Sequence, residues 1–471
     1  MDERHEKRIE NNLTNITNED FVYKVTVQSL RENLSEDARV LFDSTPHIPL
    51  IVGDSYFIHY SVTPTLREEN EDPIMQKALE FDREYITSDE CIELRTITML
   101  DDELSMIYGI KFAEEIIAEL RQRLEQQIQQ QNQNGQCQYN NLQSLLNDAK
   151  SGNQNAQQML SQMCQQVLQQ MLDDQNGNGQ CVLHQIMQNA TKNAKDFTQK
   201  AKDIRDLMGG KEAGKEAGSF QKTLDLTKKI MAVREYDQVI SFAKKITDSM
   251  PRFATIIKER DIMGDEVGGY YLTKKLERAI PRELALPEDL LMYKLASGGF
   301  LAKEKLATKE GAYYVIIDKS GSMAGDKTVW ARSVALALYR LAKMRKRKYF
   351  LRFFDTVVYP NDKPIEKPDE IIDHILTIGS DGGTDIDNAI ATALRDLKEH
   401  GLSEFTNTII LITDGEDDVK DWTDELKKHN TKLISIMIQG DNNSLRKAST
   451  IYLRAKLDKD GALRLLKIAG R

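Results

Sequence analysis

Apolar residues are spaced differently in two parts of the chain, and the spacing predicts a different kind of structure for each part. Between about residues 101 and 250, apolar side chains recur every three or four positions, which is the spacing of one buried helix face. Three such stripes run through residues 110–128, 159–172 and 186–208. Glutamine and asparagine fill the positions between them, and glutamine is an acceptable helix former on an outer face. The pattern therefore predicts a helical bundle or extended antiparallel hairpins.

The segments before and after this region are assigned to the same mainly helical domain, which we expect to span residues 21–296. Residues 1–20 are polar and are predicted to be loose. Several short apolar runs occur between about residues 21 and 100, and their pattern is mixed. Prolines interrupt the stretch from Tyr270 to about Ala296, so we expect broken helices there that connect to the last domain.

From Gly311 onward the pattern changes to short apolar runs that alternate with helical spacing. Near-continuous apolar strands separated by helices indicate a parallel sheet that is covered on both faces. Residues 297–471 are therefore predicted to form a doubly wound α/β domain. The candidate strands are 312–318, 349–354, 408–413, 433–438 and 451–457, and the candidate helices are 328–344, 369–376, 385–398 and 421–428, with a short turn near Ser444.

Composition and charge exclude several classes of function. The formal net charge is −10 and the isoelectric point is about 5.5, which argues against a general nucleic-acid binder because that function needs a basic face. The one basic run, Lys343–Lys348, falls where a helix is expected to end, so it complements the helix dipole. The four cysteines are widely separated and form no CxxC pair, which opposes a disulfide framework or a zinc site and fits a reducing cytosol.

The sequence contains neither a membrane-spanning pattern nor a complete nucleotide-binding motif. No stretch approaches the roughly 18 apolar residues of a membrane helix, and the N-terminus does not resemble a signal peptide. We therefore expect a cytoplasmic protein without a transmembrane segment. Residues 209–216 imitate the GxxxxGK spacing of a P-loop, but Glu216 occupies the place of the Mg²⁺-binding hydroxyl and no strand precedes the segment. A hinge between helices is the better interpretation, so ATP hydrolysis would belong to another protein.

The strongest chemical signal lies on the turn after the first predicted strand of the α/β domain, in the run Asp-Lys-Ser-Gly-Ser at Asp318–Ser322. A carboxylate and two hydroxyls at alternate positions are hard oxygen ligands, which suit Mg²⁺, Mn²⁺ or Ca²⁺ better than zinc. Thr384, in a Gly-Gly-Thr-Asp turn, and Asp414, after a later strand, could complete such a site. In a sheet ordered 3-2-1-4-5-6, ligands collect where the strand order reverses, between the first and fourth strands. That order would bring all three segments to one crevice.

Each of these residues alone has a simpler structural explanation. Thr384 could cap the following helix, with Asp387 completing a capping box. Asp414 with Gly415 could form a turn, and Asp318 could merely solvate a strand end. Their agreement in one predicted crevice is what favours a cation site. The other acidic residues near the motif are predicted to form a solvated rim: Asp355, Asp381, Glu416, Asp417 and Asp418.

The five donor positions resemble the metal-ion-dependent adhesion site (MIDAS) of von Willebrand factor A (VWA) domains, in chain order and residue for residue: Asp318, Ser320, Ser322, Thr384 and Asp414. The resemblance covers roughly the last 160–170 residues, the size of one domain. In that family the serine and threonine hydroxyls are ligands, and the two aspartates bind directly or through water. The resemblance implies the same roles here, with Mg²⁺ as the expected ion and Mn²⁺ or Ca²⁺ as alternatives. A site rich in neutral hydroxyls leaves the ion electrophilic and able to accept a carboxylate from another molecule.

A C-terminal VWA domain behind a long helical region is similar to the prokaryotic VWA proteins that act with MoxR-type AAA+ ATPases, the ViaA and CoxE-like group. The resemblance implies an adaptor or co-chaperone rather than an enzyme. The cation would bind an Asp or Glu of the ATPase or of a client protein, and the helical domain would bind the other participant. Two alternatives stay open. One is a Ro-like RNA-binding protein, which the acidic balance opposes; the other is a metal-dependent hydrolase, whose general base would have to be Asp381, Asp385 or Glu416.

Overall fold

The computed structural model divides the chain into two compact units, which are described separately. The first unit comprises Met1–Asp206 and Ala213–Ala232, and the second comprises Leu207–Glu212 and Val233–Arg471. The predicted boundary between residues 296 and 297 therefore lies well inside the second unit. The residues that the structure describes are 14–16, 21–133, 139–174, 181–207, 219–250, 259–260, 266–307, 310–359, 363–377, 379, 382–415 and 417–470.

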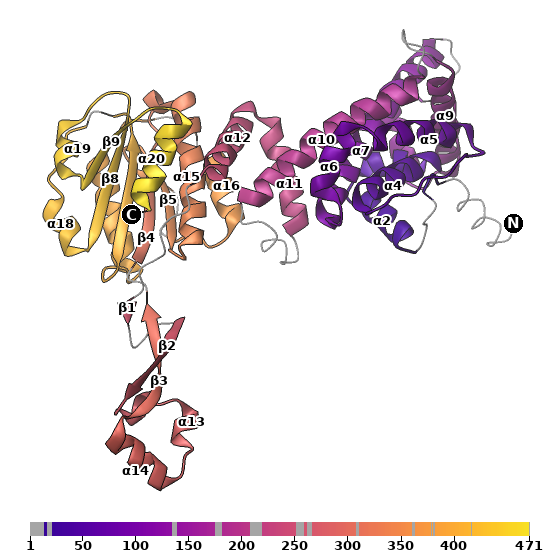
Figure 1. The fold of residues 1–471 in the computed structure, drawn as a ribbon. Helices are drawn as coiled ribbons and strands as arrows, with labels where there is room; N and C mark the ends of the chain where they lie inside the picture. Colours follow the sequence, from indigo (N-terminus) through magenta and orange to yellow (C-terminus); the bar gives the residue numbers. More distant parts are fainter. Residues whose placement is uncertain are drawn as a thin grey trace. The chain divides into compact units, whose positions relative to one another are not determined.

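The described part of the first unit is built of helices, as its sequence predicts (Figure 1). The three predicted apolar stripes lie on α7, α9 and α10 and are largely buried. The mixed segment between residues 21 and 100 is also helical, and its short apolar runs belong to α4, which is buried on most sides. The helices are α2 (Phe21–Glu32), α3 (Glu36–Asp43), α4 (His47–Tyr60), α5 (Pro73–Ile86), α6 (Asp89–Thr98), α7 (Asp102–Gln133), α8 (Leu142–Lys150), α9 (Gln154–Asp173), α10 (Val182–Leu207) and α11 (Ser219–Ala232).

Only Thr14–Ile16 of the predicted loose N-terminus is described, and these three residues are buried rather than loose. The Asn15 N–H donates to Asp54 Oδ2 at 2.8 Å, and Ile16 forms a β-bridge with Leu66. Buried hydrogen bonds of this kind fix a segment that its polar sequence alone does not. The glycine-rich segment 209–216, predicted to be a hinge, lies outside the described residues.

The second unit begins with α12 (Arg234–Asp248), which packs against α15 (Asp326–Met344), so this helix belongs with the α/β domain. An antiparallel sheet in the order β1-β3-β2 follows, made of β1 (Glu259–Arg260), β2 (Glu266–Thr273) and β3 (Phe300–Ala307). The prediction of a helical stretch starting at Tyr270 is wrong at its beginning, because Tyr270–Thr273 pair with β3. Helices occur only later in that stretch, as η2 (Leu276–Arg278), α13 (Pro281–Leu284) and α14 (Glu288–Ser297).

The sheet of the α/β domain has the strand order 3-2-1-4-5-6 that was assumed for the crevice, observed as β6-β5-β4-β7-β8-β9, with β6 as a strand beyond the five predicted. All neighbouring strands are parallel except the short β6, which runs antiparallel to β5. Neither β6 nor the last helix, α20, is among the predicted elements. The strands are β4 (Glu310–Asp318), β5 (Tyr349–Phe354), β6 (Val358–Tyr359), β7 (Thr406–Thr413), β8 (Thr431–Ile438) and β9 (Ile451–Ala455), and the remaining helices are η3 (Gly321–Met323), α16 (Pro368–Thr377), α17 (Ile386–Glu399), α18 (Thr423–Lys428), α19 (Asn443–Ala448) and α20 (Lys459–Ala469).

Helices cover both faces of this sheet, which is why its central strands are apolar at nearly every position. Tyr314 packs in a buried cluster with residues of α17, α18 and α19. Tyr313 points to the other face, where its hydroxyl donates to the Ala469 carbonyl of α20 at 2.8 Å. The register pairs Ile317 of β4 with Ile412 of β7, so the residues that follow these two strands meet at the carboxyl edge of the sheet. Among the described residues, no helix is long and apolar enough to cross a membrane.

Candidate metal-binding site

Four of the five predicted donors lie in one hydrogen-bonded cluster at the carboxyl edge of the sheet. Asp318 ends β4, the two serines follow on the next turn, and Asp414 follows β7. The Ser320 N–H donates to Asp318 Oδ1 at 2.8 Å, and the hydroxyl oxygens of Ser320 and Ser322 are 3.0 Å apart. The Ser322 hydroxyl donates to Asp414 Oδ1 at 2.8 Å. Residues almost a hundred positions apart in the chain therefore bring their side-chain oxygen atoms within hydrogen-bonding distance of one another.

The fifth predicted donor, Thr384, lies beside this cluster. A Cβ atom on Gly415 would lie 3.2 Å from Thr384 Oγ1 and 3.3 Å from Thr413 Oγ1, so both hydroxyls line the turn that follows β7. The helix that follows Thr384 is capped by Asp385, whose carboxylate accepts the Asn388 N–H at 2.9 Å. The alternative in which Thr384 is the helix cap is therefore wrong.

Asp318 is buried, with 2% of its surface exposed, and is held by hydrogen-bond donors. Thr413 donates its hydroxyl to Asp318 Oδ2 at 2.5 Å, and Ser320 donates to the other oxygen. Burial raises the pKa of Asp318 above its usual range, the nearby Asp414 raises it further, and these hydrogen bonds oppose the rise. Within the described part of the chain, Asp318 has no cationic partner. A divalent ion would supply the missing positive charge.

Two lysines that the sequence analysis did not single out lie in the site. Lys327 Nζ is 2.6 Å from Asp414 Oδ2 and donates to the Ser322 carbonyl at 3.1 Å. Lys319 Nζ is 2.9 Å from Asp355 Oδ2 and lies over the ring of Tyr359. Lys319 is an intervening residue of the serine motif, and Lys327 stands second in the helix that follows it. The closeness of both lysines to the serine motif in the sequence could have identified them as residues of the site.

The prediction that Asp355 belongs to a solvated rim is wrong. Asp355 is buried and contacts both the loop that carries Lys319 and the loop that carries Thr384. It is 6% exposed, and its carbonyl accepts the Asp385 N–H at 2.9 Å. Burial acts to raise the pKa of its carboxyl, but hydrogen bonds from Lys319 and from neighbouring N–H groups leave that pKa below its usual range. Gly382, with a φ of +103°, packs so closely that an added Cβ would lie 2.8 Å from Asp355 Oδ2.

The remaining rim residues have different positions. Asp417 accepts the Ile386 N–H at 3.0 Å through its carboxylate, so it fixes the start of α17, and Asp418 is exposed as predicted. Asp381 and Glu416 lie outside the described residues. Asp387 accepts from the Trp422 indole at 2.7 Å and is not half of a capping box.

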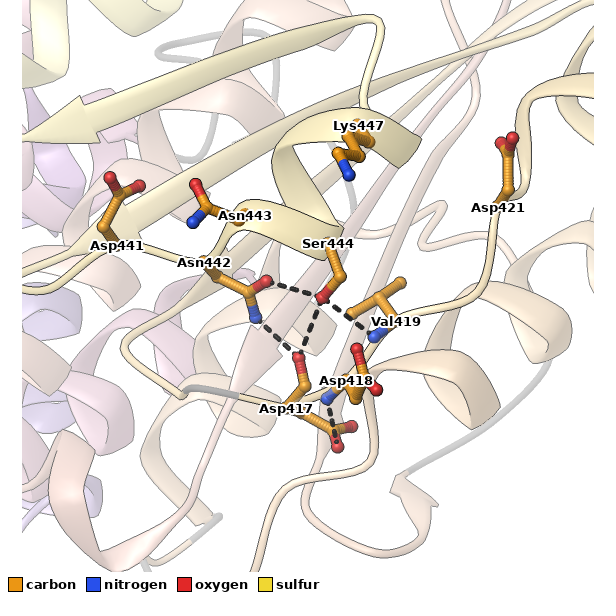
Figure 2. A pocket seen from close by; sticks show the side chains of 9 residues that line it. All are labelled: Asp417, Asp418, Val419, Asp421, Asp441, Asn442, Asn443, Ser444 and Lys447. Atoms are coloured by element: carbon orange, nitrogen blue, oxygen red, sulfur yellow. Dashed lines mark hydrogen bonds between the residues drawn. The ribbon is translucent and has the colours of Figure 1, made fainter.

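A cavity of about 610 Å³ opens next to the site, between the chain after Asp414 and the start of α19 (Figure 2). Its wall is cross-linked internally: Ser444 Oγ accepts the Val419 N–H at 3.0 Å, and the Asn442 amide donates to the Asp417 carbonyl at 2.8 Å. Four of the nine lining residues are aspartates and one is a lysine; the lining consists of Asp417, Asp418, Val419, Asp421, Asp441, Asn442, Asn443, Ser444 and Lys447.

The donor set fits a hard divalent cation. It contains two carboxylates and three hydroxyls, all oxygen donors of the kind that Mg²⁺, Mn²⁺ and Ca²⁺ accept. Over the described residues, no cluster of three or more His, Cys, Asp or Glu side chains could hold a metal ion, which leaves this mixed site as the candidate.

Comparisons with known proteins agree with the observed fold. Residues 314–453 match the model of the von Willebrand factor type A domain, so this part of the chain is a VWA domain, and it contains all five predicted donors. The uncharacterized protein MJ0811 of Methanocaldococcus jannaschii is 27% identical over 290 residues, which cover 56% of this chain and 64% of that protein. The VWFA domain-containing protein ORF892 of Acidianus two-tailed virus is 28% identical over 170 residues, which cover 34% of this chain and 18% of the viral protein. The chain thus spans less than two thirds of the length of either relative.

Two solved structures are similar to about a third of the chain. The PilB minor pilin from Streptococcus sanguinis has a TM-score of 0.27 and 11% identity, over 37% of this chain and 64% of the pilin. An aerotolerance-related membrane protein from Bacteroides fragilis has a TM-score of 0.27 and 16% identity, over 34% of this chain and 98% of that protein.

Proposed function

We propose that this chain is a metal-dependent protein–protein interaction module whose VWA domain binds one divalent cation and, through it, a carboxylate of a partner protein. Mg²⁺ is the expected ion, with Mn²⁺ or Ca²⁺ as alternatives. The observation that carries the proposal is the continuous hydrogen-bonded line from Asp318 through Ser320 and Ser322 to Asp414 at the strand ends. VWA domains are common protein-interaction modules, and this chain contains one.

The chemistry of the donors supports docking. Three of the five donors are neutral hydroxyls, so a bound ion would keep most of its charge and would attract a further anionic ligand. In the proposal, Asp318, Ser320, Ser322, Thr384 and Asp414 hold the ion, directly or through water.

The charge balance of the site matches a single added carboxylate. Asp318 and Asp414 contribute two negative charges, and Lys327 contributes one positive charge close to Asp414. The site therefore carries a net charge of −1 when empty and +1 with a divalent ion. One carboxylate from a partner brings the site to neutrality, which favours its burial at an interface.

Two described carboxylates beside the site, Asp355 and Asp385, are already engaged, and Asp385 is the one candidate general base that the structure describes. Asp355 is paired with Lys319, and Asp385 caps α17. Neither carboxylate is placed as a general base for a metal-bound water. We therefore propose an adaptor or co-chaperone, with a MoxR-type AAA+ ATPase as its partner and the helical unit binding the other participant. This finer assignment rests on the resemblance in domain arrangement and is an analogy.

The first test is direct ion binding by the full chain, measured by calorimetry with Mn²⁺. Asp318→Ala and the double variant Ser320→Ala/Ser322→Ala should lose binding, while their circular dichroism stays that of the wild type. Asp418→Ala is the matched control, because this exposed aspartate lies four residues after Asp414 and should leave binding unchanged. Absence of Mn²⁺ binding by the wild type would refute the metal site.

The second test is capture of the purified MoxR-type ATPase from the same organism by the immobilised chain. We expect capture in Mg²⁺, its loss in EDTA, and its loss with Asp318→Ala but not with Asp418→Ala. Capture that ignores both EDTA and the donor substitutions would refute the docking mechanism. Absence of capture by a wild-type chain that binds Mn²⁺ would refute this partner and leave the metal site standing.

A further inference from the structure

Lys327 brings a fixed positive charge into the proposed cation site. Its Nζ is 2.6 Å from Asp414 Oδ2 and 3.1 Å from the Ser322 carbonyl oxygen. The Asp414 side chain is 3% exposed and the Lys327 side chain 21% exposed, so the pair is shielded from solvent. An ion pair in this setting is stronger than a fully exposed pair, because water screens it less.

The position of Lys327 is set by the fold and opposes its local preference. It is the second residue of α15, where the helix dipole favours acidic side chains and disfavours a cation. The helix is held in place by the burial of its own side chains, among them Trp330 and Val334. The helix dipole therefore does not stabilise the ammonium group of Lys327, and its stabilising partner is the carboxylate of Asp414.

Both oxygens of Asp414 are engaged before any cation arrives. Oδ1 accepts the Ser322 hydroxyl at 2.8 Å, and Oδ2 receives Lys327. A divalent ion held by the serine hydroxyls and Asp414 would have to share this carboxylate with the lysine. Two positive charges that share one carboxylate repel one another.

We infer that Lys327 is a built-in competitor of the divalent cation for Asp414, which keeps ion binding weak until a partner carboxylate arrives. This inference rests on the proposed function and adds its regulation. A partner carboxylate contributes the negative charge that offsets the repulsion between the cation and the lysine. Cation and carboxylate consequently bind cooperatively, and by linkage each strengthens the other to the same extent.

The test compares Mn²⁺ affinity of the full chain by calorimetry, at fixed ionic strength, with and without acetate as the carboxylate probe. Lys327→Met removes the charge and keeps the apolar stem of the side chain. We expect it to bind Mn²⁺ at least about tenfold more tightly than the wild type without acetate. Acetate should strengthen binding by the wild type more than by the variant.

Two controls separate the charge of Lys327 from general effects. Lys327→Arg keeps the positive charge and should stay close to the wild type. Lys459→Met removes a positive charge from an exposed lysine at the start of another helix of the same unit, α20, and should also leave Mn²⁺ affinity unchanged. Lys327→Gln repeats the neutralisation with a polar side chain, in case the methionine variant does not fold.

The outcomes distinguish this inference from the function on which it rests. If the wild type binds Mn²⁺ and neither neutral variant binds it more tightly, the competition is refuted and the metal site stands. If acetate strengthens binding by the wild type and by the neutral variants equally, the cooperative role of Lys327 is refuted. If neither the wild type nor any Lys327 variant binds Mn²⁺, the proposed function and this inference fall together.

Discussion

Asp355 offers a quantitative test of how the two donor loops are held together. Its carboxylate pairs with Lys319 at 2.9 Å, and the two side chains are only 8% and 11% exposed. Removing one partner of a buried pair costs about 3–5 kcal/mol, since the other charge is left unpaired. For Asp355→Asn we expect about 2–3 kcal/mol, because the new amide oxygen can still accept the Val357 N–H and Lys319 keeps its contact with the Tyr359 ring.

Tryptophan fluorescence can report this loss for the second unit alone. The chain has two tryptophans, Trp330 and Trp422, and both lie in that unit. Urea unfolding of the full chain followed by this signal should show the reduced stability of Asp355→Asn, and Asp418→Asn serves as the exposed control. Lys319→Met and the double variant complete a double-mutant cycle.

The double-mutant cycle measures the coupling energy between Asp355 and Lys319. If the two residues form a buried ion pair, the double variant should lose less stability than the sum of the losses of the two single variants, by about 1 kcal/mol or more. A loss below about 1 kcal/mol for Asp355→Asn, or strict additivity, would show an ordinary surface pair. The same variant should weaken Mn²⁺ binding, because the lost ion pair anchors the loop that carries Lys319 between the donors Asp318 and Ser320. Unchanged Mn²⁺ affinity would show that this loop keeps its position without the Asp355–Lys319 ion pair.

Three further predictions use other parts of the fold. Asp396→Asn should cost about 3–5 kcal/mol in the same fluorescence assay, because Asp396 is 1% exposed and pairs with the buried Arg352. Gly415→Ala should lower Mn²⁺ affinity with little change in the fold, since its Cβ would lie 2.9 Å from Thr384 Cγ2 and push that side chain away; unchanged affinity would remove Thr384 from the site. Burial lowers the pKa of His59 to about 3, so its contribution to stability is complete above about pH 6.5 and is lost, at about 1.4 kcal/mol per pH unit, as the pH falls toward 3. His59→Gln should flatten this acid dependence in helix unfolding followed by circular dichroism, and an equally steep dependence in the variant would refute the assignment.

The α/β domain was predictable because its signals are local and repeated. Parallel strands buried on both faces give uninterrupted apolar runs, and the observed strands begin and end within about two residues of those runs. The missed strand β6 has only two residues, Val358 and Tyr359, too few to show any period. Strand β2 was missed for a different reason. Its partner β3 lies about thirty residues further along the chain, and that pairing overrides the local pattern at Tyr270–Thr273.

The proximity of the predicted donors also followed from the sequence, whereas the charges around them did not. Residues after parallel strands must meet at one edge, so the sequence places Asp318 and Asp414 together once the strand order is assumed. A lysine in a turn or at a helix start is ordinarily solvated, and no sequence period shows which carboxylate it reaches. The roles of Lys319, Lys327 and Asp355 depend on loop packing, such as the close approach of a glycine to Asp355, which exists only in the folded domain.

The electrostatics of the site also bear on the choice among its alternative ligands. A single carboxylate that binds the cation is neutralised there by the net positive charge proposed for the loaded site. An RNA strand would bring one phosphate for every nucleotide, and any phosphate that reached the neighbouring cavity would meet aspartates of its lining, including Asp417, Asp418 and Asp421. The net charge of −10 adds repulsion at longer range. The same surroundings disfavour phosphoester substrates, whose charge exceeds that of one carboxylate. The local charges thus support the proposal that the cation receives an isolated acidic side chain of a protein.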